Sequence, residues 1–183
     1  MNIKERSELI HQQIDDLTEK YRGLSCVSSS SPLSVSGKLS FSAQYNGVSI
    51  QDEYIVEITV PEDYPEILPT AKEIGGRISK DFHTYPDNTL CLGSPIETRI
   101  KFRKQETLLG FVEDLLIPFL YAYSYREKCG EMPYGELSHG MNGILESYKG
   151  LLQIDDDLAV MAFLKILADD NYRGHISCPC GSN

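Results

Sequence analysis

No stretch of this chain approaches the roughly 20 consecutive apolar residues that a membrane-spanning helix needs, so we expect no membrane partner. Positive charge is also scarce, because 17 Lys and Arg residues stand against 27 Asp and Glu residues, which gives a net charge of −10. Too little positive charge remains to neutralise phosphates, so nucleic acid is excluded as an expected partner. The charged opening, Met1 to Arg6, does not resemble a signal peptide.

Cysteine is sparse and irregularly spaced. The five cysteines stand at positions 26, 91, 129, 178 and 180. An odd number without framework spacing argues against a set of disulfides, so we expect reduced thiols and a cytoplasmic protein. Cys26 and Cys129 lack the spacing of metal ligands and are predicted to be packing residues. Cys91 is left available as a nucleophile.

The first half of the chain predicts a helix followed by an antiparallel sheet. Apolar residues at 3, 10, 14, 17 and 21 follow the period of an amphipathic helix. From Leu33 to Tyr45 the apolar residues occupy only odd positions, the period of a strand with one wet face. Asn46-Gly47 is a strong hairpin signal. Further strands are expected over 54–60 and 70–74, whereas the serines at 28–31 are predicted to form a loop.

The second half is predicted to be helical. Apolar residues from Leu108 to Tyr123 fit a long core helix, with a kink near Pro118 because proline removes a backbone donor. Shorter helices are expected over 144–152 and 158–167. Three aspartates precede the last of these helices, where they suit the positive end of its dipole.

These elements predict one α+β domain over residues 1–170. At 183 residues and 41% hydrophobic content, the chain is long enough to bury a sizeable core. The expected architecture is an N-terminal helix, an antiparallel β-meander, a loop that carries Cys91, and C-terminal helices packed on the sheet. Residues 171–183 are expected to form a separate tail.

The surroundings of Cys91 favour a surface loop. The segment from Asp81 to Pro95 contains Pro, Asp, Asn, Gly and Ser, which form turns, and turns run over protein surfaces. A thiol in such a loop can meet a second macromolecule. The alternative is a small hydrophobic residue packed under the loop, which is the commoner fate of a free cysteine.

The order of motifs around this loop resembles the ubiquitin-conjugating enzymes. A Tyr-Pro-x-x-x-Pro motif at 64–69 follows a predicted strand, then come His83, Cys91-Leu92 and a long helix. The resemblance implies the UBC fold over about residues 1–125. It also implies that Cys91 accepts a ubiquitin-like modifier as a thioester from an activating enzyme and passes it to an amine of a target protein. No cofactor is implied.

The family also suggests a biological setting. Bacterial members occur in antiphage defence operons, including cyclic-oligonucleotide signalling systems (CBASS) in which the conjugated protein is the nucleotidyltransferase itself. The resemblance therefore implies two kinds of cargo for Cys91: a ubiquitin-like modifier, or the C-terminus of a nucleotidyltransferase.

One departure from the family affects the chemistry. The family's cysteine follows a His-Pro-Asn tripeptide, whereas here His83 matches the first member and Thr84-Tyr85 replaces Pro-Asn. In the family the Asn orders the loop or stabilises the oxyanion, so another donor is needed here. Asn88 and the backbone N–H groups near Cys91 are the candidates. The family's histidine is mainly structural, which is the role expected for His83.

Two other functions stay open. A catalytically inactive relative of the fold, an RWD-type binding module, would recognise a modifier without reacting with it. A cysteine hydrolase would use Cys91 with His83 as its base, but spacing does not locate the Asn or Asp that would orient the histidine. The candidate site residues are Cys91, His83 and Asn88.

The last residues resemble the start of the zinc-binding tail found at the end of SecA and in many bacterial proteins. His175, Cys178 and Cys180 supply at most three ligands, whereas a structural zinc site takes four. We therefore expect a disordered tail without metal. The motif also suggests a bacterial protein.

Overall fold

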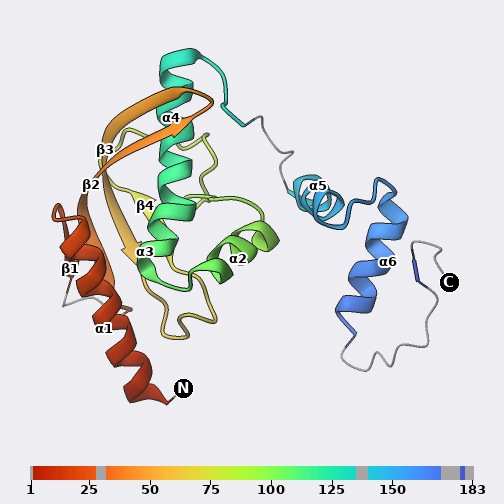
Figure 1. Ribbon diagram of the computed structural model, residues 1–183, viewed down its shortest axis with the longest axis horizontal. Coiled ribbons are helices and arrows are strands. Elements are labelled where there is room, and N and C mark those ends of the chain that lie inside the picture. Colours follow the sequence, from red (N-terminus) through yellow and green to blue (C-terminus); the bar gives the residue numbers. More distant parts are fainter. Residues whose placement is uncertain (1, 28–31, 135–139, 170–177, 180–183) are drawn as a thin grey trace. The chain divides into compact units, whose positions relative to one another are not determined.

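The computed structural model describes residues 2–27, 32–134, 140–169 and 178–179 (Figure 1). The chain divides into two compact units, residues 1–93 with 98–135, and residues 94–97 with 136–183. The predicted domain over 1–170 spans both units, so its upper boundary stays a prediction. The loop expected at 28–31 and most of the tail lie outside the described residues.

The α+β class predicted from the sequence is confirmed. The elements in chain order are α1 (Ile3–Lys20), β1 (Leu24–Val27), β2 (Ser34–Tyr45), β3 (Val48–Thr59), β4 (Thr70–Glu73), α2 (Pro95–Lys104), α3 (Leu108–Phe111), the π-helical turn η1 (Val112–Leu116), α4 (Ile117–Cys129), α5 (Met141–Leu152) and α6 (Asp157–Leu167). None of the helices in the described residues is long and apolar enough to cross a membrane.

The N-terminal helix begins with a capping box. The Asn2 side chain accepts a hydrogen bond from the Glu5 N–H, and the Glu5 carboxylate accepts one from the Asn2 N–H, each at 2.9 Å. These bonds satisfy backbone donors that the helix cannot pair itself. The predicted apolar stripe is buried at Ile10, Ile14 and Leu17, whereas Ile3 is exposed. Helix α1 contacts β1 and α3.

The sheet is an antiparallel meander in the order β1-β2-β3-β4. Tyr45 pairs with Val48 across the predicted two-residue turn, in which Asn46 and Gly47 have φ of 45° and 81°. Positive φ at both positions is what this hairpin turn requires. Strand β1 was not predicted, because four residues that include Ser25 and Cys26 show little apolar alternation.

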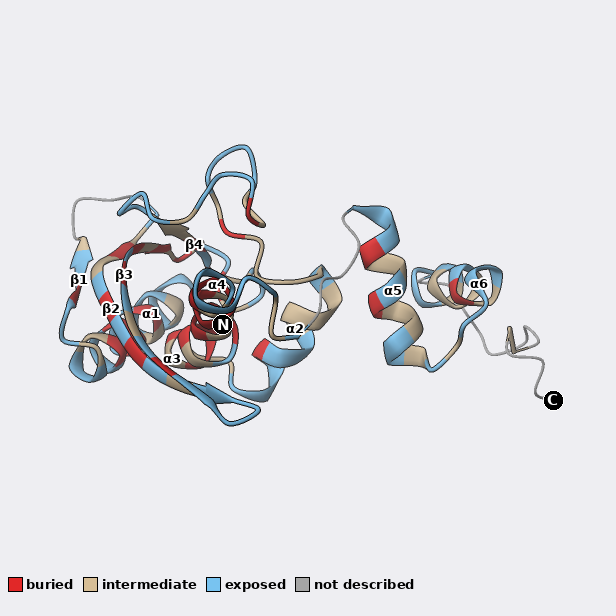
Figure 2. Cartoon of the chain, turned by 90° about the horizontal axis from the view of Figure 1, so that it is seen from above, coloured by how far each residue is buried: buried red, intermediate tan, exposed pale blue. Residues whose placement is uncertain are grey.

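The core lies between the sheet and the helices. Alternating positions predicted from the sequence are buried on both long strands (Figure 2), at Val35, Leu39 and Phe41 of β2 and at Tyr54, Val56 and Ile58 of β3. Val60, just after β3, is buried as well. Helix α4 contacts β2 and β3, so the prediction of a helix on the sheet is confirmed for α4. The packing of α5 and α6 on the sheet stays a prediction.

The long core helix is interrupted where the proline was expected to bend it. Residues 108–129 form α3, the π-helical turn η1 and then α4, which has Pro118 in its first turn. Proline has no N–H, and its ring collides with the carbonyl four residues earlier, which here belongs to Asp114. In η1 the Ile117 N–H bonds the Val112 carbonyl, five residues back, which widens the turn before the proline.

Helix α2 was not predicted, although its start carries a recognisable signal. Ser94 precedes the helix, Pro95 is its first residue, and Glu97 is its third. The Ser94 hydroxyl donates to the Glu97 carboxylate at 3.0 Å and accepts from the Glu97 N–H at 3.4 Å. Serine at the cap, proline at the first position and glutamate at the third is a helix-start pattern.

The second unit contains the two predicted C-terminal helices. Gln153, in a left-handed conformation, ends α5. The Asp156 carboxylate caps α6, because it accepts from the N–H groups of Leu158 and Ala159 at 2.7 and 3.1 Å. Asp157 lies in the first turn of α6, where its charge suits the helix dipole as expected. Lys149 forms an ion pair with Asp157, which joins the two helices.

Candidate functional site around Cys91

Cys91 ends a short hairpin that begins at His83. The Cys91 N–H donates to the His83 carbonyl at 2.7 Å, and the Tyr85 N–H donates to the Thr89 carbonyl at 2.8 Å. These two bonds flank the antiparallel bridge between Thr84 and Leu90, which lies on the second, returning strand of the hairpin. The predicted turn-rich loop is therefore an ordered hairpin whose tip is formed by residues 86–88.

The returning strand fixes this hairpin to the sheet. Leu90 is 4% exposed, and its N–H donates to the Ala71 carbonyl of β4 at 2.8 Å. Thr89 also forms an antiparallel bridge with Lys72. Leu90 is thus both a core residue and a backbone partner of β4, which fixes the position of the neighbouring Cys91 beside the edge of the sheet.

The hairpin register places Cys91 and Tyr85 on the same face. Side chains directly opposite in an antiparallel ladder point the same way, and neighbours along a strand alternate. Thr84 and Leu90 share the face on which Leu90 enters the core. The opposite face of the hairpin carries the positions of His83, Tyr85, Thr89 and Cys91.

The Cys91 sulfur has two polar neighbours and is partly buried. Its thiol donates to the Gly93 carbonyl at an S···O distance of 3.8 Å. The Tyr85 hydroxyl lies near the Cys91 side chain, and its interaction with that group, together with burial and the charge of Asp87, raises the pKa of Tyr85 to about 12. A partly exposed thiol beside a hydroxyl donor differs from the fully buried packing residue that was the alternative.

His83 is held against the core. Its backbone has a φ of 39°, a left-handed conformation that is uncommon outside glycine. Its ring meets the buried Phe82 ring edge-on, with centroids 4.9 Å apart and an interplanar angle of 88°. Phe82 in turn packs against Phe119 and Tyr123 of α4 at 5.5 and 4.8 Å. The histidine thus links the hairpin to the aromatic core.

Asn88 occupies the tip of the hairpin and is exposed. Its φ is 66°, and its N–H donates to the Tyr85 carbonyl at 2.9 Å, which closes the turn. Beside it, the Asp87 carboxylate accepts from the N–H and hydroxyl of Thr89 at 3.0 and 2.9 Å. Within the part of the chain that the structure describes, the Asn88 amide makes no hydrogen bond. Its oxyanion role stays a prediction.

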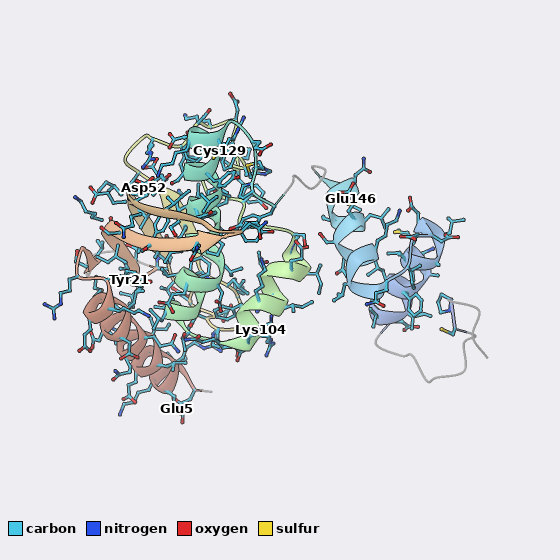
Figure 3. All side chains as sticks on the ribbon, turned by 45° about the horizontal axis from the view of Figure 1, so that its top comes forward. Glu5, Tyr21, Asp52, Lys104, Cys129 and Glu146 are labelled. Carbon is cyan, nitrogen blue, oxygen red and sulfur yellow. The ribbon has the colours of Figure 1, made fainter. Side chains whose placement is uncertain are left out.

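An ion-pair network holds the segment that leads into the hairpin. Arg77 forms two hydrogen bonds to Asp52 at 2.8 Å each and reaches Glu127 of α4 at 2.6 Å. Its guanidinium also lies 4.4 Å from the ring centre of Tyr54. Asp52 accepts a further bond from Ser124 at 2.7 Å. In Figure 3, Asp52 and the end of α4 that carries Cys129 lie on the same side of this unit.

The Arg77 guanidinium dominates the electrostatics of Asp52. Its hydrogen bonds hold the pKa of Asp52 well below the usual range for a carboxyl group, and the Ser124 bond adds to this effect. The backbone beside Arg77 is ordered by Glu73, whose carboxylate accepts from the N–H groups of Gly75, Arg77 and Ile78. This network supports the approach to Cys91 without touching the sulfur.

The two-proline motif lies beside α2. Tyr64 is fully buried, and its hydroxyl donates to the Gln13 side chain of α1 at 2.5 Å. Arg99 of α2 donates to the carbonyls of Pro65 and Glu66 at 3.4 and 2.5 Å. The motif therefore joins α1, the end of the sheet and the helix that follows Cys91, which is a structural role.

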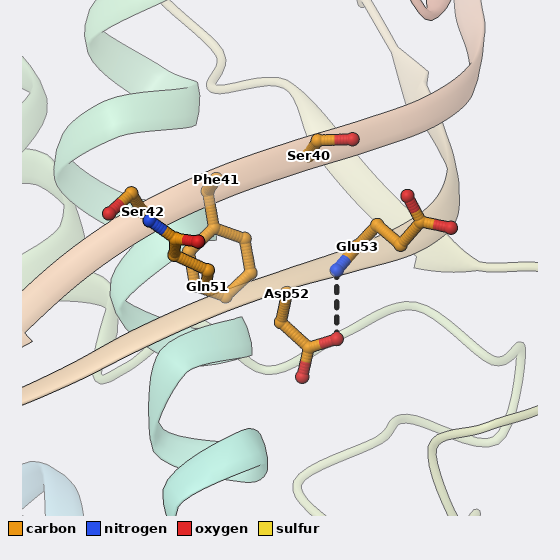
Figure 4. Close-up of a pocket in the computed structure, with 6 residues that line it drawn as sticks. All are labelled: Ser40, Phe41, Ser42, Gln51, Asp52 and Glu53. Carbon is orange, nitrogen blue, oxygen red and sulfur yellow. Dashed lines mark hydrogen bonds between the residues drawn. The ribbon is translucent and has the colours of Figure 1, made fainter.

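A surface depression elsewhere does not form a second site. It has a volume of about 520 Å³ and is lined by Ser40, Phe41, Ser42, Gln51, Asp52 and Glu53 (Figure 4). Its acidic groups are already engaged, because Asp52 binds Arg77 and Glu53 forms an ion pair with Lys38 at 2.8 Å. The Asp52 carboxylate also accepts from the Glu53 N–H at 2.8 Å.

The other cysteines differ from expectation. Cys26 and Cys129 are exposed, so the prediction that they are packing residues is wrong. Cys26 lies on the edge strand β1 and Cys129 ends α4, where few neighbours cover either side chain. Two of the three tail residues considered as zinc ligands, His175 and Cys180, lie outside the described residues.

Neither a protein-family model nor a curated protein sequence matches this chain. The functional case therefore rests on the residues around Cys91.

Proposed function

We propose that Cys91 carries the C-terminal acyl group of a modifier protein as a thioester and transfers it to an amine. This is the reaction of ubiquitin-conjugating enzymes, which the order of motifs resembles. The observation that carries the proposal is the setting of the thiol. Cys91 is partly exposed on a hairpin that Leu90 fixes to the sheet, so the sulfur is both presented and held in place.

The chemistry needs two acyl exchanges at one sulfur. In the first, the Cys91 thiolate attacks the carbonyl carbon of the donor thioester, a new S–C bond forms, and the donor thiolate leaves. In the second, an amine attacks the same carbon, a C–N bond forms, and Cys91 leaves as a thiolate while the amine proton passes to solvent. The first step needs no strong base, because the thiolate is already a good nucleophile. In the second step the thiolate is the leaving group, and it leaves more readily than an alkoxide because thiols are the stronger acids.

His83 serves a structural role in this proposal. Its edge contact with Phe82 and its carbonyl bond to the Cys91 N–H support that role. The partners proposed are an activating enzyme, a target amine, and as cargo either a ubiquitin-like modifier or a nucleotidyltransferase C-terminus. A bacterial, cytoplasmic antiphage system is the proposed setting, and the UBC fold is the proposed finer classification of the α+β unit.

A synthetic peptide with a C-terminal glycine thioester tests the proposal without an activating enzyme. We expect intact mass to show one acyl adduct, peptide mapping to place it on Cys91, and added lysine to discharge it with formation of an amide. Cys91→Ala should lose the adduct and keep its melting temperature, because a partly exposed thiol contributes little packing. Cys129→Ala, which removes an exposed thiol outside the hairpin, is the matched control and should keep the adduct.

Three results would contradict the proposal. An equal adduct yield in Cys91→Ala would place the acyl group on another cysteine. Release of the free peptide acid, lost in both Cys91→Ala and His83→Ala, would indicate a hydrolase. Unchanged peptide thioester, with neither adduct nor turnover, would indicate a binding module.

A further inference from the structure

Tyr85 and Cys91 are diagonal neighbours across the hairpin. Tyr85 pairs with Thr89 through a backbone bond of 2.8 Å, and Cys91 lies two residues beyond Thr89 on the same face. Diagonal partners in an antiparallel pair are roughly 7–8 Å apart at the backbone, which a tyrosine side chain spans. This register brings the Tyr85 side chain toward the Cys91 side chain, in agreement with the effect of Cys91 on the pKa of Tyr85.

We propose that the Tyr85 hydroxyl is the donor that stabilises the Cys91 thiolate, both before acyl transfer and when the sulfur leaves. The contact itself stands on the hairpin geometry, whereas its part in acyl transfer rests on the function proposed above. Tyr85 is 50% exposed, so its ring does not fill the core, and its hydroxyl is available to donate a hydrogen bond to the sulfur.

The two protonation states of Cys91 use different partners. The neutral thiol donates its proton to the Gly93 carbonyl, at an S···O distance of 3.8 Å. The thiolate has no proton to donate and becomes an acceptor, which the Tyr85 O–H satisfies. When the thiol ionises its proton passes to solvent, and the hydroxyl of Tyr85 keeps its own.

Tyr85 remains a donor throughout the working range of pH. Its pKa is raised to about 12, chiefly by the interaction with Cys91, so the hydroxyl stays protonated wherever the thiolate forms. The charge of Asp87 at the hairpin tip acts on Tyr85, and Lys72 of β4 attracts Asp87. His83 occupies the same face of the hairpin. The negative charge of Asp87 disfavours the Cys91 thiolate. A hydrogen bond donated by the neutral Tyr85 hydroxyl offsets that repulsion.

Tyr85→Phe removes the hydroxyl and keeps the ring. We expect iodoacetamide to alkylate Cys91 about 3- to 10-fold more slowly at pH 7, since a hydrogen bond to a charged group is lost at a partly exposed site. The midpoint of the rate–pH profile should move upward, and the plateau at high pH should be kept. Peptide-resolved mass spectrometry follows each cysteine in one digest, so Cys129 is an internal reference whose rate stays unchanged.

A superimposable profile for wild type and Tyr85→Phe would overturn the inference. Tyr134→Phe is the matched control, because Tyr134 is also 50% exposed and lies on the segment after α4. It should leave the Cys91 profile unchanged. An equal shift in Tyr134→Phe would show that the effect is general to surface tyrosines and would also overturn the inference.

The same variants separate this inference from the proposed function. A shifted alkylation profile without any acyl adduct on Cys91 would support the tyrosine as thiolate donor and contradict acyl transfer. An adduct that forms and discharges at wild-type rates in Tyr85→Phe, with an unchanged alkylation profile, would support acyl transfer and overturn the role of Tyr85.

Discussion

Tyr85 and Asn88 lie only three residues apart, yet the hairpin gives them different surroundings. Tyr85 lies in the paired part of the hairpin, where antiparallel register directs its hydroxyl to the Cys91 sulfur. Asn88 lies at the tip, where a φ of 66° closes the turn. Tyr85 therefore lies near the Cys91 sulfur, whereas Asn88 closes the turn through its backbone.

Asn88 can be tested by separating its backbone role from its side chain. Asn88→Gly keeps the left-handed conformation and removes the amide, so we expect wild-type rates of thioester formation and discharge. Asn88→Ala should unfold more easily by about 1 kcal/mol, because alanine is strained at positive φ. Single-turnover discharge to lysine and urea titration measure the two effects.

A donor role for Asn88 would give a different pattern. Loss of one oxyanion donor typically slows the chemical step about 10²- to 10³-fold. If discharge slows to that extent in Asn88→Gly while the free energy of unfolding is unchanged, the amide is part of the catalytic machinery, as the sequence suggested.

At the scale of elements, the hairpin depends on how its flanking segments are held. The Leu90 N–H bonds β4 and so holds the returning strand of the hairpin. The first strand is held by the contact of His83 with Phe82, which packs against α4. Before the hairpin, Arg77 joins β3 to α4 through Asp52 and Glu127. These contacts come from distant parts of the chain, so the position of the sulfur is a property of the packed sheet and helix.

The Asp52–Arg77 pair predicts a specific dependence of stability on pH. The folded pKa of Asp52 is lowered below its unfolded value of about 3.9. Its contribution is therefore complete above the unfolded pKa and is lost as pH falls toward the folded pKa. Asp52→Asn should lower the free energy of unfolding by about 1–2 kcal/mol at pH 7, and the difference from wild type should shrink below about pH 4.

Urea titrations at several pH values between 7 and 3 measure this difference. Glu53→Gln is the matched control on the same strand, because its ion pair with Lys38 is exposed and should change stability by less than about 0.5 kcal/mol. A constant gap between Asp52→Asn and wild type over the whole range would contradict the linkage.

At the scale of the molecule, the second unit exposes several large apolar side chains. Val160 is fully buried on α6, whereas Leu158 is 81% exposed and Leu167 is also exposed. Helices α5 and α6 contact each other, which buries the face of α6 that carries Val160. The apolar residues of α6 therefore fall into two groups, one buried and one exposed to solvent.

Two substitutions on α6 distinguish those surfaces. Leu158→Ser should change the melting temperature little, because the side chain is in water before and after unfolding. Val160→Ser should lower the free energy of unfolding by about 2–3 kcal/mol, since it leaves a cavity and buries a hydroxyl. Thermal denaturation of both variants followed by circular dichroism makes the comparison. Equal losses would contradict the assigned burial.

Local patterns in the sequence determined most of the secondary structure. Alternation over 33–45, the Asn46-Gly47 turn and the three-to-four spacing of α1 each act between near neighbours, and all three are confirmed. A π-helical turn over Val112–Leu116 precedes Pro118, whereas the kink expected there stays a prediction. Strand β1 is too short to show an apolar pattern, and the sequence signal for α2 is confined to its start at residues 94–97.

The surroundings of Cys91 were decided by tertiary structure. Turn formers in the sequence indicated a loop, but the sheet partner of Leu90 and the core contacts of Phe82 lie many residues away. The pairing of His83 with Cys91 sets the register, and that register directs the Tyr85 hydroxyl to the sulfur. The turn-forming residues determined that a thiol could lie at the surface. Packing determined which side chains lie beside that thiol, because contacts across a hairpin depend on register and not on residue type alone.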